Sequence, residues 1–260
     1  MKELIDIQNQ ADTRDIALAK VGVKGLEYPI RVLDKVKKIQ HTVAKVDLYA
    51  DLPQHFKGTH MSRFIEIFHQ YCDDLSMPRF MEMLSAIRTE LDAESAYGSI
   101  SFPYFIEKKA PVSGLPGIMS YSCKYQGLVS GRKHFTVAVS VPVTTVCPCS
   151  KAISERGAHN QRGIVTAELE LGPFFWIEDI IDIVEQAASS PVYSLLKRED
   201  EKFITENAYD RPRFVEDLVR EVYTRIKELN QFPRFSVEAE NFESIHNHSA
   251  FAFAEFTGEA

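Results

Sequence analysis

The same strand-then-helix pattern occurs twice in this 260-residue chain, and this repetition limits the folds open to it more than any other feature. Residues 46–53 read V-D-L-Y-A-D-L-P and residues 166–173 read T-A-E-L-E-L-G-P, so apolar and polar side chains alternate in both. Such alternation is typical of an antiparallel strand with one buried face. An amphipathic helical pattern follows each segment, which indicates a diverged duplication.

Each half of the chain adds a second helical pattern and further alternating segments. In the helical patterns apolar residues recur at every third or fourth position, so each helix has one apolar side. Both halves therefore read strand-strand-helix-helix-strand-strand. We expect helices over residues 61–75, 78–91, 177–188 and 212–229, strands over 19–32, 42–53, 100–106, 119–125, 134–146, 165–171, 235–239 and 250–254, and an irregular insert over 189–210.

These patterns predict an α+β fold of two modules, each an antiparallel sheet with two antiparallel helices on one face. We place a polar N-terminal arm at residues 1–18, the first module at 19–130 and the second at 131–260. Two cysteines close together and three of the histidines that stand out in the sequence fall in the second module. We therefore expect the second module to carry the chemistry.

Charge and cysteine content exclude several classes of protein. The net charge of −7 argues against general nucleic-acid binding, which needs a basic face. Four cysteines are too few for a disulfide scaffold in a chain of this length. The first 15 residues are too polar for a signal peptide, and no apolar run is long enough to span a bilayer. We expect a cytoplasmic protein with reduced thiols and no membrane contact.

The stretch from Val146 to Arg162 reads V-C-P-C-S-K-A-I-S-E-R-G-A-H-N-Q-R and follows a long alternating strand. It contains Cys147, Cys149 and His159, and thiolate and imidazole are the softest metal ligands that proteins offer. Nearby cations could hold an anionic substrate. A pair of close cysteines is also compatible with a small buried pair or with half of a structural zinc site. The cations of the stretch are Lys151, Arg156 and Arg162.

Two further stretches hold potential ligands far along the chain. In E-S-I-H-N-H-S-A, His246 and His248 are two residues apart, so in an extended segment both would point to the same side. In the acidic run over residues 196–210, Glu201 could supply an oxygen ligand, although composition alone favours a solvated charged loop. Glu216 lies off the apolar stripe of its helix, where a carboxylate is normally solvated.

Four separate motifs resemble those of the type IB GTP cyclohydrolases, and the resemblance covers nearly the whole chain. It implies a bimodular tunnelling fold that assembles as a homotetramer. It also implies conversion of GTP and water to 7,8-dihydroneopterin triphosphate and formate, the first step of tetrahydrofolate biosynthesis. The motifs are K-G-T-H-M-S-R-F at 57–64, C-P-C-S-K-A-I-S-E-R-G-A-H-N-Q-R at 147–162, D-E-K-F-I-T-E-N-A-Y at 200–209 and E-S-I-H-N-H-S-A at 243–250.

The resemblance also assigns roles to residues of this chain. It implies that Cys147, His159, Glu201 and His246 surround a metal ion. It implies further that Glu216 anchors the guanine edge of GTP, since a carboxylate accepts two hydrogen bonds from that edge. Thiolate, imidazole and carboxylate ligands suit zinc, iron or manganese, and the sequence does not choose between these metals.

The remaining roles are assigned by chemistry. His248 is our candidate proton donor, because an imidazole titrates near neutral pH, and a supporting role beside the metal ligands fits it equally. Cys149 would support the metal site or pair reversibly with Cys147 when metal is absent. The candidates for the triphosphate are Lys151, Arg156 and Arg162, with Arg63 or Lys57 of a neighbouring subunit as further options.

Two other readings compete with the cyclohydrolase. One is another tunnelling-fold enzyme, such as the nitrile reductase of the queuosine pathway, in which a cysteine attacks the substrate covalently. The nicotinamide site and the motif of that family are not evident in this sequence. The other is a non-catalytic protein in which Cys147 and His159 hold a structural zinc closed by four protein ligands.

Overall fold

The computed structural model describes residue 8 and residues 10–258, so residues 1–7 and 9 of the predicted arm lie outside the described part. Within that part the strands form an antiparallel sheet of nine strands, hydrogen-bonded in the order β1-β2-β3-β4-β5-β6-β8-β9, with β7 beside β5. The α+β class predicted from the sequence is confirmed. The strands are β1 (Leu18–Asp34), β2 (Lys38–Leu52), β3 (Ala96–Lys109), β4 (Pro116–Val129), β5 (Lys133–Val146), β6 (Asn160–Glu170), β7 (Ser190–Pro191), β8 (Arg234–Asn241) and β9 (Ala250–Thr257), and the helices are α1 (Met61–Tyr71), α2 (Met77–Glu90), α3 (Pro148–Ile153), α4 (Ile177–Ala187), α5 (Arg198–Asp210) and α6 (Val215–Glu228).

Contacts divide the chain into two compact units. The first comprises the described residues up to Phe102 together with Lys124–Thr136, and the second comprises Pro103–Cys123 and Val137 onward. Strands β3, β4 and β5 therefore contribute residues to both units. The module boundary near residue 130 stays a prediction.

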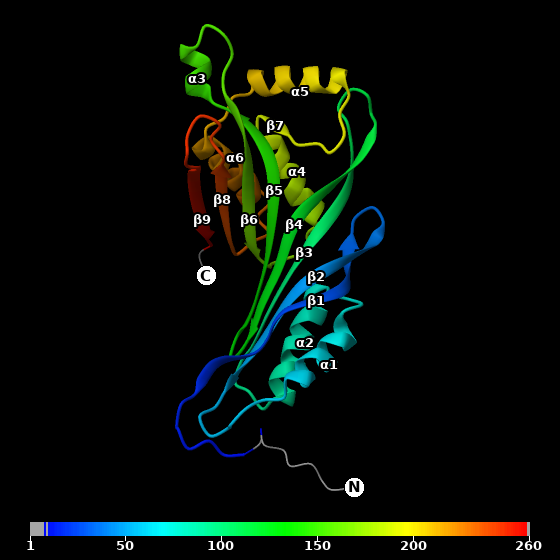
Figure 1. The fold of residues 1–260 in the computed structure, drawn as a ribbon, viewed down its shortest axis with the longest axis vertical. Helices are drawn as coiled ribbons and strands as arrows, with labels where there is room; N and C mark the ends of the chain where they lie inside the picture. The colour runs from blue at the N-terminus through cyan, green and yellow to red at the C-terminus, as the bar shows by residue number, and fades with distance from the viewer. Residues whose placement is uncertain (1–7, 9, 259–260) are drawn as a thin grey trace. The chain divides into compact units, whose positions relative to one another are not determined.

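The first unit is built on β1, β2 and the helix pair α1 and α2, which lie side by side (Figure 1). Its core forms because the apolar stripes of both helices meet the buried face of β2, the face predicted from the alternation. Pro78 lies in the first turn of α2, where its missing N–H costs nothing. Fully buried members of this core are Val46, Leu48, Phe64, Phe68, Phe80, Leu84 and Ile87.

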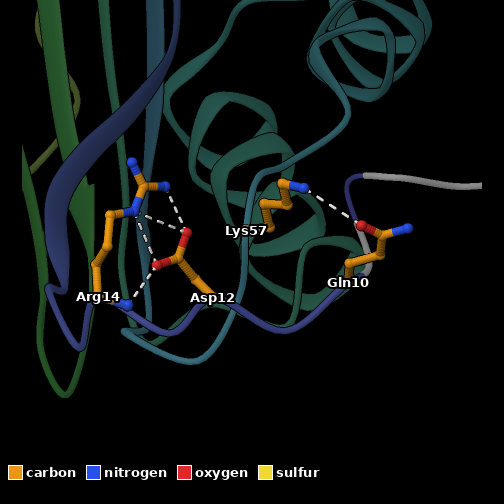
Figure 2. Close-up of polar contacts among 4 residues, drawn as sticks. All are labelled: Gln10, Asp12, Arg14 and Lys57. Carbon is orange, nitrogen blue, oxygen red and sulfur yellow. Dashed lines mark hydrogen bonds and ion pairs between the residues drawn. The ribbon is translucent and has the colours of Figure 1, made fainter.

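The described part of the arm follows the loop between β2 and α1. The backbone N–H of Asp12 donates to the carbonyl of His55 at 3.2 Å. Figure 2 shows the Lys57 ammonium facing the Gln10 side chain, at 3.3 Å, and the Arg14 guanidinium facing the Asp12 carboxylate. The hydrogen bonds from Arg14 lower the pKa of Asp12 to about 2. Lys57, one of our more remote phosphate candidates, is therefore in contact with the arm.

The second unit repeats the design around β6, β8 and β9. Strand β6 pairs with β8, which pairs with β9, and α6 packs on β8 and β9 and against α4. The inward faces of these strands and the stripes of both helices make the core. Its fully buried members include Val165, Ala167, Leu169, Ile180, Val184, Leu218, Val222 and Val237.

The irregular insert predicted for residues 189–210 is wrong, because this segment contains β7 and the helix α5. We missed α5 because it has no apolar stripe, and only Asp200 and Ala208 are buried on it. Polar contacts hold it instead: Asp200 accepts hydrogen bonds from the backbone N–H groups of Lys197, Val112 and Ser113 at 2.8–2.9 Å. Burial raises the pKa of Asp200, but these hydrogen bonds outweigh it and hold the pKa well below its usual range.

No helix in the part of the chain that the structure describes is long and apolar enough to cross a membrane.

Candidate active site

Cys147 stands where β5 ends and α3 begins. It is the N-cap residue of α3, and Pro148 occupies the first position of that helix. The half-buried Cys147 sulfur accepts a hydrogen bond from the backbone N–H of Ser150 at 3.5 Å. Cys149 is the second residue of α3. Its side chain is exposed, and like Cys147 it is a free thiol. The two cysteines predicted as partners therefore occupy different surroundings.

His159 is hydrogen-bonded to Cys147 through the backbone. Its carbonyl accepts from the backbone N–H of Cys147 at 3.1 Å, and its own N–H donates to Ser150 Oγ at 3.2 Å. The Nδ1 atom is 3.0 Å from Gln161 Oε1 and 3.8 Å from Glu243 Oε2. Since these two oxygens occupy the Nδ1 side, Nε2 is the ring nitrogen that remains for a ligand or a substrate.

The loop between β8 and β9 carries the other two histidines of the predicted site. The rings of His246 and His248 stack with centroids 5.0 Å apart, and both residues are exposed. His248 Nδ1 is also 3.3 Å from Asn247 Oδ1. Glu243 belongs to the same loop and faces His159, so the loop lies next to the Cys147 region even though the two imidazoles point into solvent.

Glu201 is exposed in the first turn of α5. The opposite end of α5 is the end that meets α3, where the Lys151 ammonium donates to the carbonyl of Tyr209 and lies 4.2 Å from the centre of its ring. Figure 1 shows α3 and α5 at the same end of this unit. Among the described residues no group of three or more His, Cys, Asp or Glu side chains is placed to hold a metal ion.

The start of α6 is tied to the end of β5. The backbone N–H of Arg213 donates to the carbonyl of Val146 at 3.0 Å, directly before Cys147. Glu216, our guanine anchor, follows three residues later in the first turn of α6 and is exposed. The Nε of Arg213 is buried and has no hydrogen-bond partner within the described residues. The backbone that carries Arg213 therefore lies next to the residue that precedes Cys147.

The predicted phosphate ligands differ in how they are placed. Lys151 is bound to α5 through Tyr209. Arg156 and Arg162 are exposed, and Arg156 lies in the turn that Gly157 completes with φ of 82°. This positive φ favours glycine, and the turn returns the chain from α3 to His159. Lys151 thus belongs to α3, Arg156 to the turn that follows it, and Arg162 to β6.

The donor atoms at Cys147 and His159 fit a divalent transition metal. A thiol sulfur and an imidazole nitrogen are ligands that zinc, iron and manganese accept in proteins. An imidazole ligand normally donates its other N–H to an oxygen, and Gln161 and Glu243 supply oxygens at that position.

We missed three residues of this site in the sequence. Gln161 lies two positions after His159 at the start of a strand, so period two would have placed both on one side. Arg213 is part of P-R-F-V-E-D, where we noted only the glutamate. Glu243 is the first residue of the motif E-S-I-H-N-H-S-A, in which we noted only the two histidines.

Comparison with known proteins gives one consistent family. The family described as type I GTP cyclohydrolase folE2 matches residues 4–252. GTP cyclohydrolase FolE2 of Geotalea uraniireducens (strain Rf4) is 55% identical over 250 residues, which cover 96% of this chain and 92% of that protein. GTP cyclohydrolase FolE2 of Syntrophus aciditrophicus (strain SB) is 56% identical over 253 residues, which cover 97% of this chain and 99% of that protein.

Solved structures resemble the fold at low sequence identity. Uricase from Arthrobacter globiformis has a TM-score of 0.54 and 6% identity, with 92% of this chain and 93% of that chain covered. Urate oxidase from Bacillus sp. TB-90 has a TM-score of 0.51 and 10% identity, covering 93% of this chain and 100% of that chain. This likeness concerns the fold alone, and it confirms the tunnelling fold that the sequence motifs implied.

Proposed function

This chain belongs to the type I GTP cyclohydrolase FolE2 family, and we propose that Cys147 and His159 form the centre of the site at which it opens the imidazole ring of GTP. The family reaction converts GTP and water to 7,8-dihydroneopterin triphosphate and formate, the first step of tetrahydrofolate biosynthesis. The observation that supports the assignment is the 3.1 Å hydrogen bond from the backbone N–H of Cys147 to the carbonyl of His159, which joins the two residues that carry the thiol and the imidazole.

The proposed metal ligands are Cys147, His159, Glu201 and His246. The contact between Cys147 and His159 supports the first two, and the family motifs support Glu201 and His246. A divalent metal held there would lower the pKa of water, so that hydroxide forms near neutral pH. Manganese, iron and zinc all suit this set of donors.

The other side chains bind and orient GTP. Glu216 accepts hydrogen bonds from the N–H donors of the guanine edge, and the bond from Arg213 to Val146 supports its place near Cys147. Ring opening requires protons at the ring nitrogens, and we assign their delivery to His248. Cys149, which is exposed and two residues after Cys147, supports the metal site without binding the metal. The triphosphate meets the cations Lys151, Arg156 and Arg162.

We further propose that the enzyme works as a cytoplasmic homotetramer. The family resemblance supports the tetramer, and the cysteines in the described residues, all of which are free thiols, are compatible with a reducing compartment. Sedimentation equilibrium of the purified chain would measure the number of subunits.

Removal of the metal is expected to abolish the reaction. After treatment with a chelator and dialysis, formate release from GTP should fall by at least about 100-fold, because water is then no longer activated. Adding Mn²⁺, Fe²⁺ or Zn²⁺ separately should restore formate and the fluorescent pterin with at least one of them. Absence of both products with all three metals would rule out the cyclohydrolase, and loss of folding on chelation without any activity beforehand would favour a structural zinc.

Glu216→Gln is expected to lower kcat/KM for GTP by about 100-fold, because two hydrogen bonds to a charged acceptor are weakened. Inosine triphosphate lacks the 2-amino donor, so the variant should discriminate less between it and GTP than the wild type does. Steady-state formate release with both nucleotides measures this. Asp217→Asn, in the same helical turn, is the matched control. Equal losses in the two variants would mean that Glu216 does not read the guanine edge.

A further inference from the structure

We propose that Gln161 is a positioning residue that holds His159 in one tautomer, with the proton on Nδ1 and the lone pair on Nε2. The proposal rests on the proposed function only in assigning His159 to the reacting centre. The tautomer itself is a property of the chain without metal or substrate.

The Gln161 amide is hydrogen-bonded to a buried hydroxyl on the neighbouring strand. Gln161 lies on β6 and is 6% exposed, and its Nε2 donates to Thr145 Oγ1 at 2.9 Å. Thr145 lies on β5 and is fully buried, so this bond is shielded from water. With its N–H group directed at Thr145, the amide directs Oε1 at His159 Nδ1, 3.0 Å away. A carbonyl oxygen can only accept, so in this orientation of the amide Nδ1 carries the hydrogen.

A carboxylate on the same side of the ring favours the same tautomer. An amide turned by 180° would present N–H to Nδ1 and oxygen to the hydroxyl of Thr145, and the pair alone could satisfy either arrangement. Glu243 Oε2 lies 3.8 Å from Nδ1, with both side chains about 15% exposed. An ionised carboxylate accepts only, and it attracts a proton on the nearer nitrogen. The charge of Glu243 therefore favours the arrangement in which the Gln161 oxygen accepts a hydrogen bond from Nδ1–H.

This tautomer makes Nε2 the functional nitrogen. A neutral imidazole binds a metal, or accepts a proton, through the nitrogen that has no hydrogen. The backbone of His159 is fixed to Cys147 and Ser150, so the ring can turn only about its own side-chain bonds. Gln161 restricts that remaining freedom and thereby presents Nε2 in a defined direction beside the Cys147 thiol.

The ring ¹⁵N shifts of His159 in the metal-free protein test the proposal directly. We expect a protonated Nδ1 and an unprotonated Nε2 in the wild type. Gln161→Met has a similar volume and no acceptor oxygen, so it should lose this preference and lower both Zn²⁺ affinity and kcat by about 10–100-fold. Thr145→Val should also weaken the preference for the Nδ1–H tautomer. Thr145→Ser, which keeps the hydroxyl, should give the wild-type ¹⁵N shifts.

Each possible result of these experiments either supports or contradicts the role of Gln161. A wild-type Nε2–H tautomer, or an unchanged tautomer in both Gln161→Met and Thr145→Val, would overturn the proposal. If Gln161→Met fails to fold, the contrast between Thr145→Val and Thr145→Ser still measures the effect. A wild-type Nδ1–H signal in a protein that never releases formate would retain the role of Gln161 and refute the proposed function, because the spectrum requires no turnover.

Discussion

Replacing Cys147 with alanine is expected to reduce kcat/KM for GTP by about 1,000-fold or more, which corresponds to roughly 4 kcal/mol of lost transition-state stabilisation. The variant loses the sulfur that we propose as a metal ligand. The chain should still fold, because the sulfur accepts one long hydrogen bond from the described residues, at the start of α3, and the loss of a helix cap costs about 1 kcal/mol. Bound metal, measured by elemental analysis, should fall together with formate release.

The neighbouring thiol provides the comparison for this variant. Cys149 is exposed and lies on the other side of Pro148, so Cys149→Ala should lower kcat/KM by less than about tenfold. Circular dichroism on both variants would establish that each is folded. If Cys147→Ala releases formate at the wild-type rate, Cys147 is not a metal ligand, and equal losses in the two variants would mean that the thiols act as a pair.

The sequence predicted most helices and strands because their burial is periodic. The buried face of β2 and the stripes within α2, α4 and α6 lie at the positions that the pattern indicated, whereas on α1 the predicted Ile65 is exposed and Ile67 is buried instead. The sequence did not predict helix α5, because this helix is held by hydrogen bonds to the Asp200 carboxylate. The partners Val112 and Ser113 are almost ninety residues away in the chain. A buried carboxylate bound to a distant turn leaves no periodic signal in its own segment.

In the candidate site, too, contacts between distant segments could not be predicted from the sequence. Cys147 and His159 could be paired from the sequence because only α3 and the turn at Gly157 separate them. Gln161 could have been found by period two. Glu243 and Arg213 carry no signal in their own residues. Glu243 faces His159 because the loop after β8 returns there, and the Arg213 backbone binds Val146 because the segment before α6 returns to the end of β5. Contacts between segments that are far apart in the chain are fixed by packing, and they leave no pattern in the local sequence.

The largest stability effect is expected at a buried ion pair in the second unit. Lys108 Nζ lies 2.6 Å from Glu185 Oε2, and the other carboxylate oxygen accepts from the hydroxyl of Tyr121 at 2.8 Å. Lys108 also donates to the carbonyl of Val192, in the segment that leads from α4 to α5. The side chains of the pair are only 14% and 9% exposed. Burial lowers the pKa of Lys108 despite the attraction of Glu185, and it raises the pKa of Tyr121 well above its usual range.

Glu185→Leu should therefore lower the free energy of unfolding by about 3–5 kcal/mol, because it leaves the Lys108 ammonium buried without its counter-ion. Urea denaturation followed by circular dichroism measures the change. The matched control is the double variant Lys108→Met with Glu185→Leu, which leaves no unpaired charge and should recover a large part of the loss. If the double variant is as unstable as Glu185→Leu, the loss comes from packing around α4, and the ion pair is not what holds α4 and the Val192 segment to β3.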